Sequence, residues 1–231
     1  MQNIESSSLA AGFVRVKYDA VWKGSVTDFI RENRSIQDVY YKTVSELGDA
    51  LQLLEKSGAA PVAEDGKVAG NAAARIVTNN LDFLIVSKSG KGQLVSTEDD
   101  FCIVTEFDPV HWSLNYYAKD SSTKPTSDAP LHHAALHAAA EYRWDETPYA
   151  SLHGHAVETA DKAEQLGVPY SAKETLFSTP EDTYELLVLL KQYPFPRHKI
   201  FVRIGHGFVV LGKTVAETVE TFKANIMPFV V

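Results

Sequence analysis

Apolar side chains recur every three or four residues between Ser35 and Ser57, which predicts an amphipathic helix over this stretch. Its apolar face consists of Ile36, Tyr40, Val44, Leu47, Leu51 and Leu54. Ser57-Gly58 is a typical helix end. The preceding residues, 1–24, have no clear period and are expected to form an N-terminal arm or an early strand. We interpret residues 61–76 as a turn-rich connection.

Short apolar runs bounded by polar turns predict strands in the rest of the chain. These strands are expected at residues 81–87, 101–107, 111–118 and 147–155, with two buried strands within 199–212. Four further helices are expected at residues 130–144, 156–167, 180–194 and 214–226. Because strands and helices are mixed throughout, we expect a single α/β domain over residues 1–231.

The composition narrows the classes of partner. The chain has 231 residues and a formal net charge of −8, which argues against nucleic acid or an anionic membrane as the main partner. Its apolar runs are too short to span a bilayer, and its first residues lack the pattern of a signal peptide. Cys102 is the only cysteine, so no internal disulfide can form. A reduced, cytoplasmic protein is expected.

The first candidate for chemistry is a pair of histidines at a predicted strand end. His153 and His155 point to the same face of a strand, because side chains alternate. His206 follows between two glycines at the turn that joins the last two strands. Three imidazoles with one open position are typical of a catalytic divalent metal, usually Zn²⁺. The alternative is a surface pair and an unrelated turn histidine.

His133 and His137 lie one turn apart on a predicted Ala-rich helix. That spacing can also bind a metal, but no acidic residue completes a His-Glu-x-x-His arrangement. We interpret these two and His132, on the same helix, mainly as residues of the helix face, with a supporting position behind the metal ligands as the alternative.

Three small polar turns are candidates for holding an anion. Thr126 and Ser127 offer hydroxyl and N–H groups just ahead of a predicted helix start. Asp128 next to them is either an acid/base group or the helix N-cap. The turns around Asn71 and around Ser89-Gly90 are weaker signals for phosphate, and an ordinary tight turn explains each of them better.

The order of these motifs resembles that of the class II aldolase/adducin family. The motifs are Gly70-Asn71, Ser89-Gly90, the loop from Lys124 to His132, His153-x-His155 and Gly205-His206-Gly207. The family includes fuculose-phosphate and rhamnulose-phosphate aldolases and ribulose-phosphate 4-epimerase. The resemblance covers residues 35–222, and its motifs are specific jointly rather than singly.

The resemblance implies a three-layer α/β/α fold with a mainly antiparallel central sheet, and a homotetramer. It makes His153, His155 and His206 the ligands of a divalent metal, most simply Zn²⁺, and Asp128 the acid/base group. The substrate-binding residues would be Asn71, Ser89, Gly90, Thr126 and Ser127. The implied activity is that of a metal-dependent lyase or epimerase on a small anionic hydroxy-carbonyl compound such as a sugar phosphate, with aldol cleavage passing through a metal-stabilised enediolate.

Several positions depart from the family pattern. Val68 and Ala73 replace hydroxyl residues near the Gly-Asn turn, and Gly205 stands where the family has Asn. The segment between His155 and His206 is short, and the tail after the last helix carries no Tyr. These changes leave the metal triad intact and weaken the phosphate site. A dehydratase or decarboxylase on the same scaffold, or a non-catalytic adducin-like interaction domain, remains an alternative.

Overall fold

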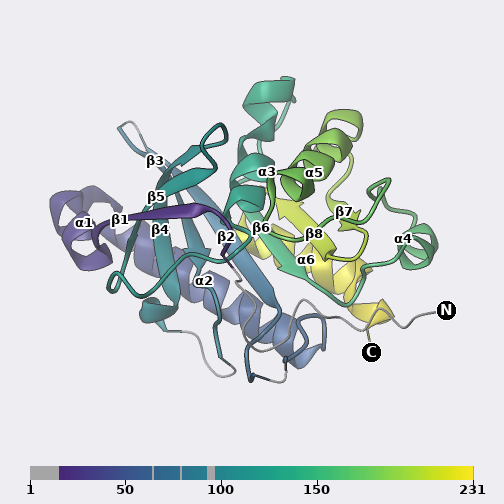
Figure 1. Ribbon diagram of the computed structural model, residues 1–231, viewed down its shortest axis with the longest axis horizontal. Helices are drawn as coiled ribbons and strands as arrows, with labels where there is room; N and C mark the ends of the chain where they lie inside the picture. Colours follow the sequence, from purple (N-terminus) through teal and green to yellow (C-terminus); the bar gives the residue numbers. More distant parts are fainter. Residues whose placement is uncertain (1–15, 64, 79, 93–96, 231) are drawn as a thin grey trace.

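The computed structural model describes residues 16–63, 65–78, 80–92 and 97–230 (Figure 1). Eight strands form one sheet in the order β1-β5-β4-β3-β2-β6-β8-β7. Among the strand pairs of the described residues, only β1–β5 is parallel, so the sheet is mainly antiparallel, as expected. The strands are β1 (Asp19–Ser25), β2 (Gly70–Val77), β3 (Asp82–Ser87), β4 (Phe101–Asp108), β5 (Ser113–Ala118), β6 (Ala150–Gly154), β7 (Ile200–Arg203) and β8 (Gly207–Gly212).

Helices cover both faces of this sheet, which confirms the three-layer α/β/α prediction. Helices α2 and α6 pack on one face and α3 and α5 on the other (Figure 1). The helices are α1 (Val26–Glu32), α2 (Gln37–Lys56), α3 (Ala129–Tyr142), α4 (Ala160–Leu166), α5 (Pro180–Gln192) and α6 (Val215–Asn225). Short 3-10 helices occupy Arg34–Ile36, Glu98–Asp100 and Met227–Phe229.

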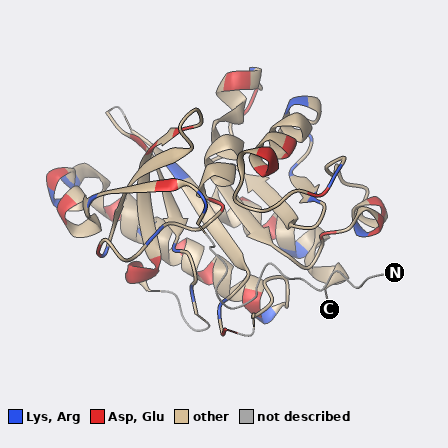
Figure 2. Ribbon diagram, viewed as in Figure 1, with Lys and Arg blue, Asp and Glu red and all other residues tan. Residues whose placement is uncertain are grey.

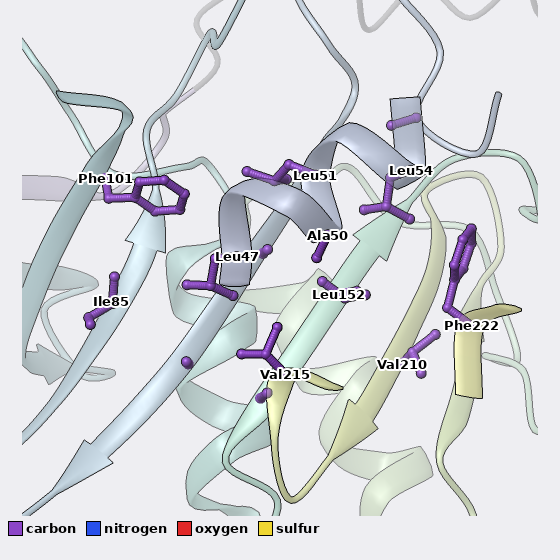
Figure 3. Close-up of a cluster of buried hydrophobic side chains, with 14 of the residues drawn as sticks. Leu47, Ala50, Leu51, Leu54, Ile85, Phe101, Leu152, Val210, Val215 and Phe222 are labelled. Atoms are coloured by element: carbon purple, nitrogen blue, oxygen red, sulfur yellow. The ribbon is translucent and has the colours of Figure 1, made fainter. Parts of the chain in front are cut away.

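The larger hydrophobic core lies between the sheet and helices α2 and α6. Leu47, Leu51 and Leu54 of α2 belong to this core, where α2 packs against β2 and β3, and Phe222 of α6 extends the same layer over β6 and β8 (Figure 3). Burying each such side chain stabilises the fold by roughly 1.5–3 kcal/mol relative to leaving it exposed. The apolar face predicted from the sequence is therefore the face by which α2 packs on the sheet.

The interpretation of residues 61–76 as a connection is wrong from Gly70 onward, because a central strand begins there. Strand β2 is rich in alanine and glycine, which disfavour strands, but its backbone is paired on both sides, with β3 and β6. The small side chains also allow close packing. A Cβ on Gly70 would lie 2.5 Å from the Cβ of Ala60.

Helix α4 differs from expectation at its start, and the N-terminal segment follows one of its two expectations. Helix α4 starts at Ala160 rather than at residue 156, because the Thr159 side chain caps it by accepting from the Lys162 N–H. The N-terminal segment forms strand β1 from Asp19, as one of the two expectations had it, and residues 1–15 lie outside the described part.

Charged residues lie mostly on the outer helices and loops, while most of the sheet carries none (Figure 2). Among the described residues, no helix is both long enough and apolar enough to cross a membrane. The polar groups that do enter the interior gather at one edge of the sheet. There β2 and β8 begin and β3 and β6 end, next to the start of α3.

Candidate metal centre

Three histidines converge at this edge of the sheet. His153 lies near the end of β6, His155 directly follows the strand, and His206 lies in the β7–β8 hairpin. One ring nitrogen from each lies within 4.8 Å of the others. The Nε2 atoms of His153 and His155 are 3.2 Å apart.

The hairpin that carries His206 depends on its flanking glycines. Gly205 and Gly207 have φ values of 76° and 130°, which residues with side chains rarely adopt. A Cβ on Gly207 would collide with the carbonyl oxygen of Gly154. Glycine at this position therefore lets the hairpin approach the end of β6 and brings His206 next to His153.

The second ring nitrogen of each histidine faces its own partner. Nδ1 of His153 lies 2.8 Å from the carbonyl oxygen of Phe208. Nδ1 of His206 lies 3.0 Å from Asp182 Oδ2, and Nδ1 of His155 lies 3.9 Å from Glu158 Oε2. Because a carbonyl oxygen only accepts, Nδ1 of His153 carries the proton and its Nε2 carries a lone pair. Such outer partners orient metal-binding imidazoles.

The surroundings give the three imidazoles different pKa values. Burial lowers the pKa of His153 to about 4 and that of His155 well below its usual value, assisted by the charge of neighbouring histidines. Burial also opposes the charge of His206, but Asp182 and Asp128 outweigh it and raise its pKa to about 10. At neutral pH without a metal, two imidazoles are neutral and one is protonated.

Asp128 faces the histidines rather than the helix that it precedes. It occupies the N-cap position of α3, yet its side chain makes no capping hydrogen bond. Its Oδ2 accepts from Asn71 Nδ2 at 2.5 Å, and its Oδ1 lies 3.4 Å from His206 Nε2. Burial alone would raise the pKa of Asp128, but His206, His153 and His132 hold it well below the usual range. The group is an ionised carboxylate.

The residues predicted to bind substrate line one pocket with this cluster. Its cavity has a volume of about 40 Å³. The predicted residues on its wall are Asn71, Ser89, Gly90, Thr126, Ser127, Asp128, His155 and His206. His153 is fully buried behind them. The structure thus brings together groups that are up to 135 positions apart in the sequence, from Asn71 to His206.

Part of the expected anion-binding capacity is already used within the protein. The N–H of Ser89 donates to the Lys124 carbonyl and the N–H of Thr126 to the Ser87 carbonyl, each at 2.8 Å. The hydroxyls on the pocket wall remain as donors. Lys88 also lines the pocket, but its Nζ lies 2.6 Å from Asp100. The positive charge available to an anion is therefore partly neutralised.

The other histidines of α3 divide into two groups. His133 and His137 stack on each other with ring centroids 3.9 Å apart, beside Phe107 and Asp82, so they lie on the helix face and do not support the cluster. His132 is the one that faces inward. Its Nε2 lies 2.6 Å from Asn71 Oδ1.

Sequence reasoning missed Asp182, Arg203 and Phe177. Asp182 lies in the first turn of α5, where an acid is ordinarily explained by the helix dipole, and it pairs with the buried Arg203 at 2.7 Å. Phe177 lines the pocket, with its ring centroid 5.9 Å from that of His206. The sequence signal that could have found Arg203 is a charged residue within an otherwise apolar strand.

The N-terminal segment also reaches the site. Lys17 Nζ lies 3.5 Å from the centroid of the Phe177 ring. The Tyr18 hydroxyl lies 2.9 and 3.0 Å from the carbonyl oxygens of Pro125 and Thr126, which fastens this segment to the loop that carries the predicted anion site.

No family model and no curated protein sequence matches the chain. Solved structures do. A sugar-phosphate aldolase from Thermotoga maritima is similar with a TM-score of 0.61 and 14% identity, over 82% of this chain and 92% of that one. An aldolase II superfamily protein from Pseudomonas syringae gives a TM-score of 0.57 at 16% identity, over 87% and 76%.

An L-fuculose 1-phosphate aldolase from Glaciozyma antarctica PI12 gives a TM-score of 0.55 at 19% identity, over 84% of this chain and 72% of that one. Identities this low establish the arrangement of the chain and not its chemistry. The protein has the fold of the class II aldolase superfamily.

Proposed function

We propose that this protein is a metal-dependent lyase or epimerase that acts next to a carbonyl group. One observation carries the proposal. One ring nitrogen from each of His153, His155 and His206 lies within 4.8 Å of the others, and the Nε2 atoms of His153 and His155 lie 3.2 Å apart. The pKa values of His153 and His155 favour the neutral form that binds a metal. Two ligands of a tetrahedral Zn²⁺, each at about 2.0–2.1 Å, lie roughly 3.3 Å apart.

Other features of the residues fit a divalent cation. Asp128 Oδ1 is buried and has no hydrogen-bond partner among the described residues, and it faces His206. Three imidazoles beside a carboxylate match the preferences of Zn²⁺. His153, His155 and His206 would hold the ion through Nε2, with Asp128 as a neighbouring oxygen donor or proton acceptor.

The reaction assigns separate tasks to these groups. In aldol cleavage the bond between the α and β carbons of the carbonyl compound breaks. The β-hydroxyl loses its proton and becomes a carbonyl, and the electron pair of the broken bond is delocalised onto the original carbonyl oxygen. A bound cation supplies positive charge that polarises this oxygen. Asp128, ionised and next to the histidines, accepts the proton at Oδ1. Epimerisation by retro-aldol cleavage and re-addition uses the same groups.

The substrate class follows from the rest of the pocket. Hydroxyls of Ser89, Thr126 and Ser127 on the same wall favour an anionic group, for which a phosphate of a small sugar is the leading candidate. Val68 adds an apolar surface, and the pairing of Lys88 with Asp100 reduces the available charge. We therefore expect weaker selectivity for phosphate than a pocket wall of polar residues alone would give.

The presence of all three histidines favours an enzyme over a non-catalytic interaction domain. Dehydration and decarboxylation use the same cation and carboxylate and differ in the substrate, so the substrate assay separates them. We also propose a homotetramer, which light scattering tests. A monomer at assay concentration would contradict that proposal and leave the metal proposal unaffected.

An assay panel tests the function. Phosphorylated and free ketoses and hydroxy acids would be offered to protein loaded with Zn²⁺, Mn²⁺ or Co²⁺, and products identified by mass spectrometry. We expect turnover of a phosphorylated ketose that depends on the metal, and competitive inhibition by inorganic phosphate. Turnover that persists in metal-free protein would overturn the metal mechanism. Preference for a free sugar without phosphate inhibition would overturn the anion site.

A further inference from the structure

A continuous chain of buried hydrogen bonds leads from the sheet to the Asp128 carboxylate. Ser151 Oγ lies 2.7 Å from His132 Nδ1. His132 Nε2 lies 2.6 Å from Asn71 Oδ1, and Asn71 Nδ2 lies 2.5 Å from Asp128 Oδ2. All four side chains are buried. They come from four different segments, β6, α3, β2 and the loop before α3, so the fold itself brings the chain together.

The chemistry of these groups fixes the direction of every bond. Asn71 Nδ2 lies 2.5 Å from Asp128 Oδ2, and an amide nitrogen only donates, so Asn71 presents its NH₂ group to the carboxylate oxygen. The Asn71 carbonyl oxygen then faces His132 and needs a donor, so His132 Nε2 carries the hydrogen. His132 Nδ1 is left with a lone pair, which accepts from the Ser151 hydroxyl. Burial lowers the pKa of His132 to about 3, in agreement with a neutral ring that has one donor and one acceptor.

This arrangement engages both polar atoms of the Asn71 side chain within the protein and leaves one amide N–H for a ligand. The oxygen of its amide group is engaged by His132 and the nitrogen by Asp128, although its side chain is on the pocket wall. Asn71 also pairs with His153 across the β2–β6 ladder, which fixes its backbone next to a candidate metal ligand. Both ends of the amide therefore act within the protein.

We propose that Asn71 and His132 are positioning residues for Asp128, and that holding this carboxylate, rather than an anion, is the main task of the Asn71 side chain. The amide holds Oδ2, so the carboxylate cannot rotate, and Oδ1 stays directed toward His206 and the reacting atoms. His132 in turn fixes the orientation of the amide. The catalytic consequence of this assignment rests on the proposed function. The donor and acceptor roles along the hydrogen-bond chain do not depend on it.

The test compares Asn71→Ala, Asn71→Ser, His132→Gln and His132→Leu in the chain of 231 residues. Asn115→Ala is the control for the asparagine, because Asn115 donates to Glu106 at the same 2.5 Å on strand β5, outside the site. His133→Gln is the control for the histidine. Three quantities are measured: Co²⁺ affinity, inorganic phosphate affinity, and exchange of the carbon-bound hydrogen of dihydroxyacetone phosphate in D₂O.

Positioning predicts a specific pattern. Both Asn71 variants bind Co²⁺ and phosphate within about twofold of wild type, while kcat for exchange falls on the order of 100-fold and KM changes little. His132→Gln, whose amide can still donate to Asn71, retains more activity than His132→Leu. The controls match wild type. If the Asn71 variants instead lose phosphate affinity and raise KM tenfold with kcat unchanged, Asn71 is a substrate ligand and the proposal is wrong.

A spectroscopic measurement separates this proposal from the proposed function. Two-dimensional ¹H–¹⁵N spectra of the imidazoles of metal-free wild type report the tautomer of each ring, and we expect the Nε2–H form for His132. The Nδ1–H form would overturn the chain. A wild type that binds no Co²⁺ and exchanges no hydrogen contradicts the proposed function, while the tautomer and phosphate results still decide the role of Asn71.

Discussion

Oδ2 of Asp182 lies 3.0 Å from Nδ1 of His206, and Oδ1 of the same carboxylate lies 2.7 Å from the Arg203 guanidinium. All three side chains are buried. Burial would raise the pKa of Asp182, but His206 and Arg203 hold it below the usual value. The carboxylate thus orients one imidazole through a charge that a buried arginine balances. Asp182 lies on helix α5 and Arg203 ends strand β7, so these two side chains connect both elements to the candidate metal centre.

The first prediction concerns metal affinity. Asp182→Asn removes the charge that orients His206, so we expect the affinity for Zn²⁺ to fall roughly 10- to 100-fold. Competition with a chromophoric chelator measures this fall. Asp161→Asn, on the separate helix α4, is a control. Equal affinities of wild type and Asp182→Asn would show that His206 needs no carboxylate partner.

The second prediction concerns stability. Arg203→Met removes one of the two cations that face the buried Asp182 carboxylate and leaves only His206, so the free energy of unfolding should fall by up to roughly 3–5 kcal/mol. Urea denaturation measures the loss. The double variant Arg203→Met/Asp182→Asn should lose less than the sum of the single losses, because the second change removes the carboxylate that lost its guanidinium partner. Strict additivity would contradict a coupled pair.

The third prediction concerns protons released on metal binding. The metal-free His206 keeps its proton up to a pKa of about 10, so a metal must displace that proton at neutral pH. The His206 proton competes with the metal at every pH below this pKa, and the competition weakens as the pH rises toward it. The affinity for the metal should therefore rise with pH between about 7 and 10. Calorimetry in two buffers of different ionisation enthalpy should give about one proton per ion. No release at pH 7.5 would contradict the protonated state of His206.

The fourth prediction separates the two roles of Asp128. Asp128→Asn should retain Zn²⁺ and lose most turnover, because the proton acceptor is gone. Its free energy of unfolding should not fall by the amount typical of a removed N-cap, about 1 kcal/mol, because the Asp128 side chain makes no capping hydrogen bond. Thr179→Ala is the contrasting variant, because Thr179 does cap α5 and its loss should cost that amount. Full turnover in Asp128→Asn would reject the acid/base role.

The elements and groups that sequence patterns predicted share one property: their signal is local. The three-to-four-residue spacing of Leu47, Leu51 and Leu54 specifies α2 without reference to any other segment. His153 and His155 likewise reveal a shared face by their spacing alone. The position of His206 followed from its two glycines, which mark a tight hairpin.

What the sequence did not reveal depends on contacts between distant segments. Strand β2 is disfavoured by its own residues and forms because β3 and β6 pair with it. From the sequence alone, Asp182 is explained as an ordinary acidic residue in the first turn of a helix. Only the fold shows that it lies next to His206, 24 positions later in the chain. Asn71 was assigned to the anion site, and its hydrogen bonds to His132 and Asp128 suggest a different task. Tertiary partners decide each of these cases.

The central claim is that His153, His155 and His206 bind one divalent ion, and a direct metal titration tests it. Metal-free wild type, His155→Ala and the control His198→Ala would each be titrated with Zn²⁺ and with Co²⁺, whose absorption reports tetrahedral nitrogen coordination. We predict one tightly bound ion per chain in wild type and in His198→Ala, and no tight binding in His155→Ala, with the fold retained. Wild type without tight binding, or His155→Ala with unchanged binding, would contradict the account.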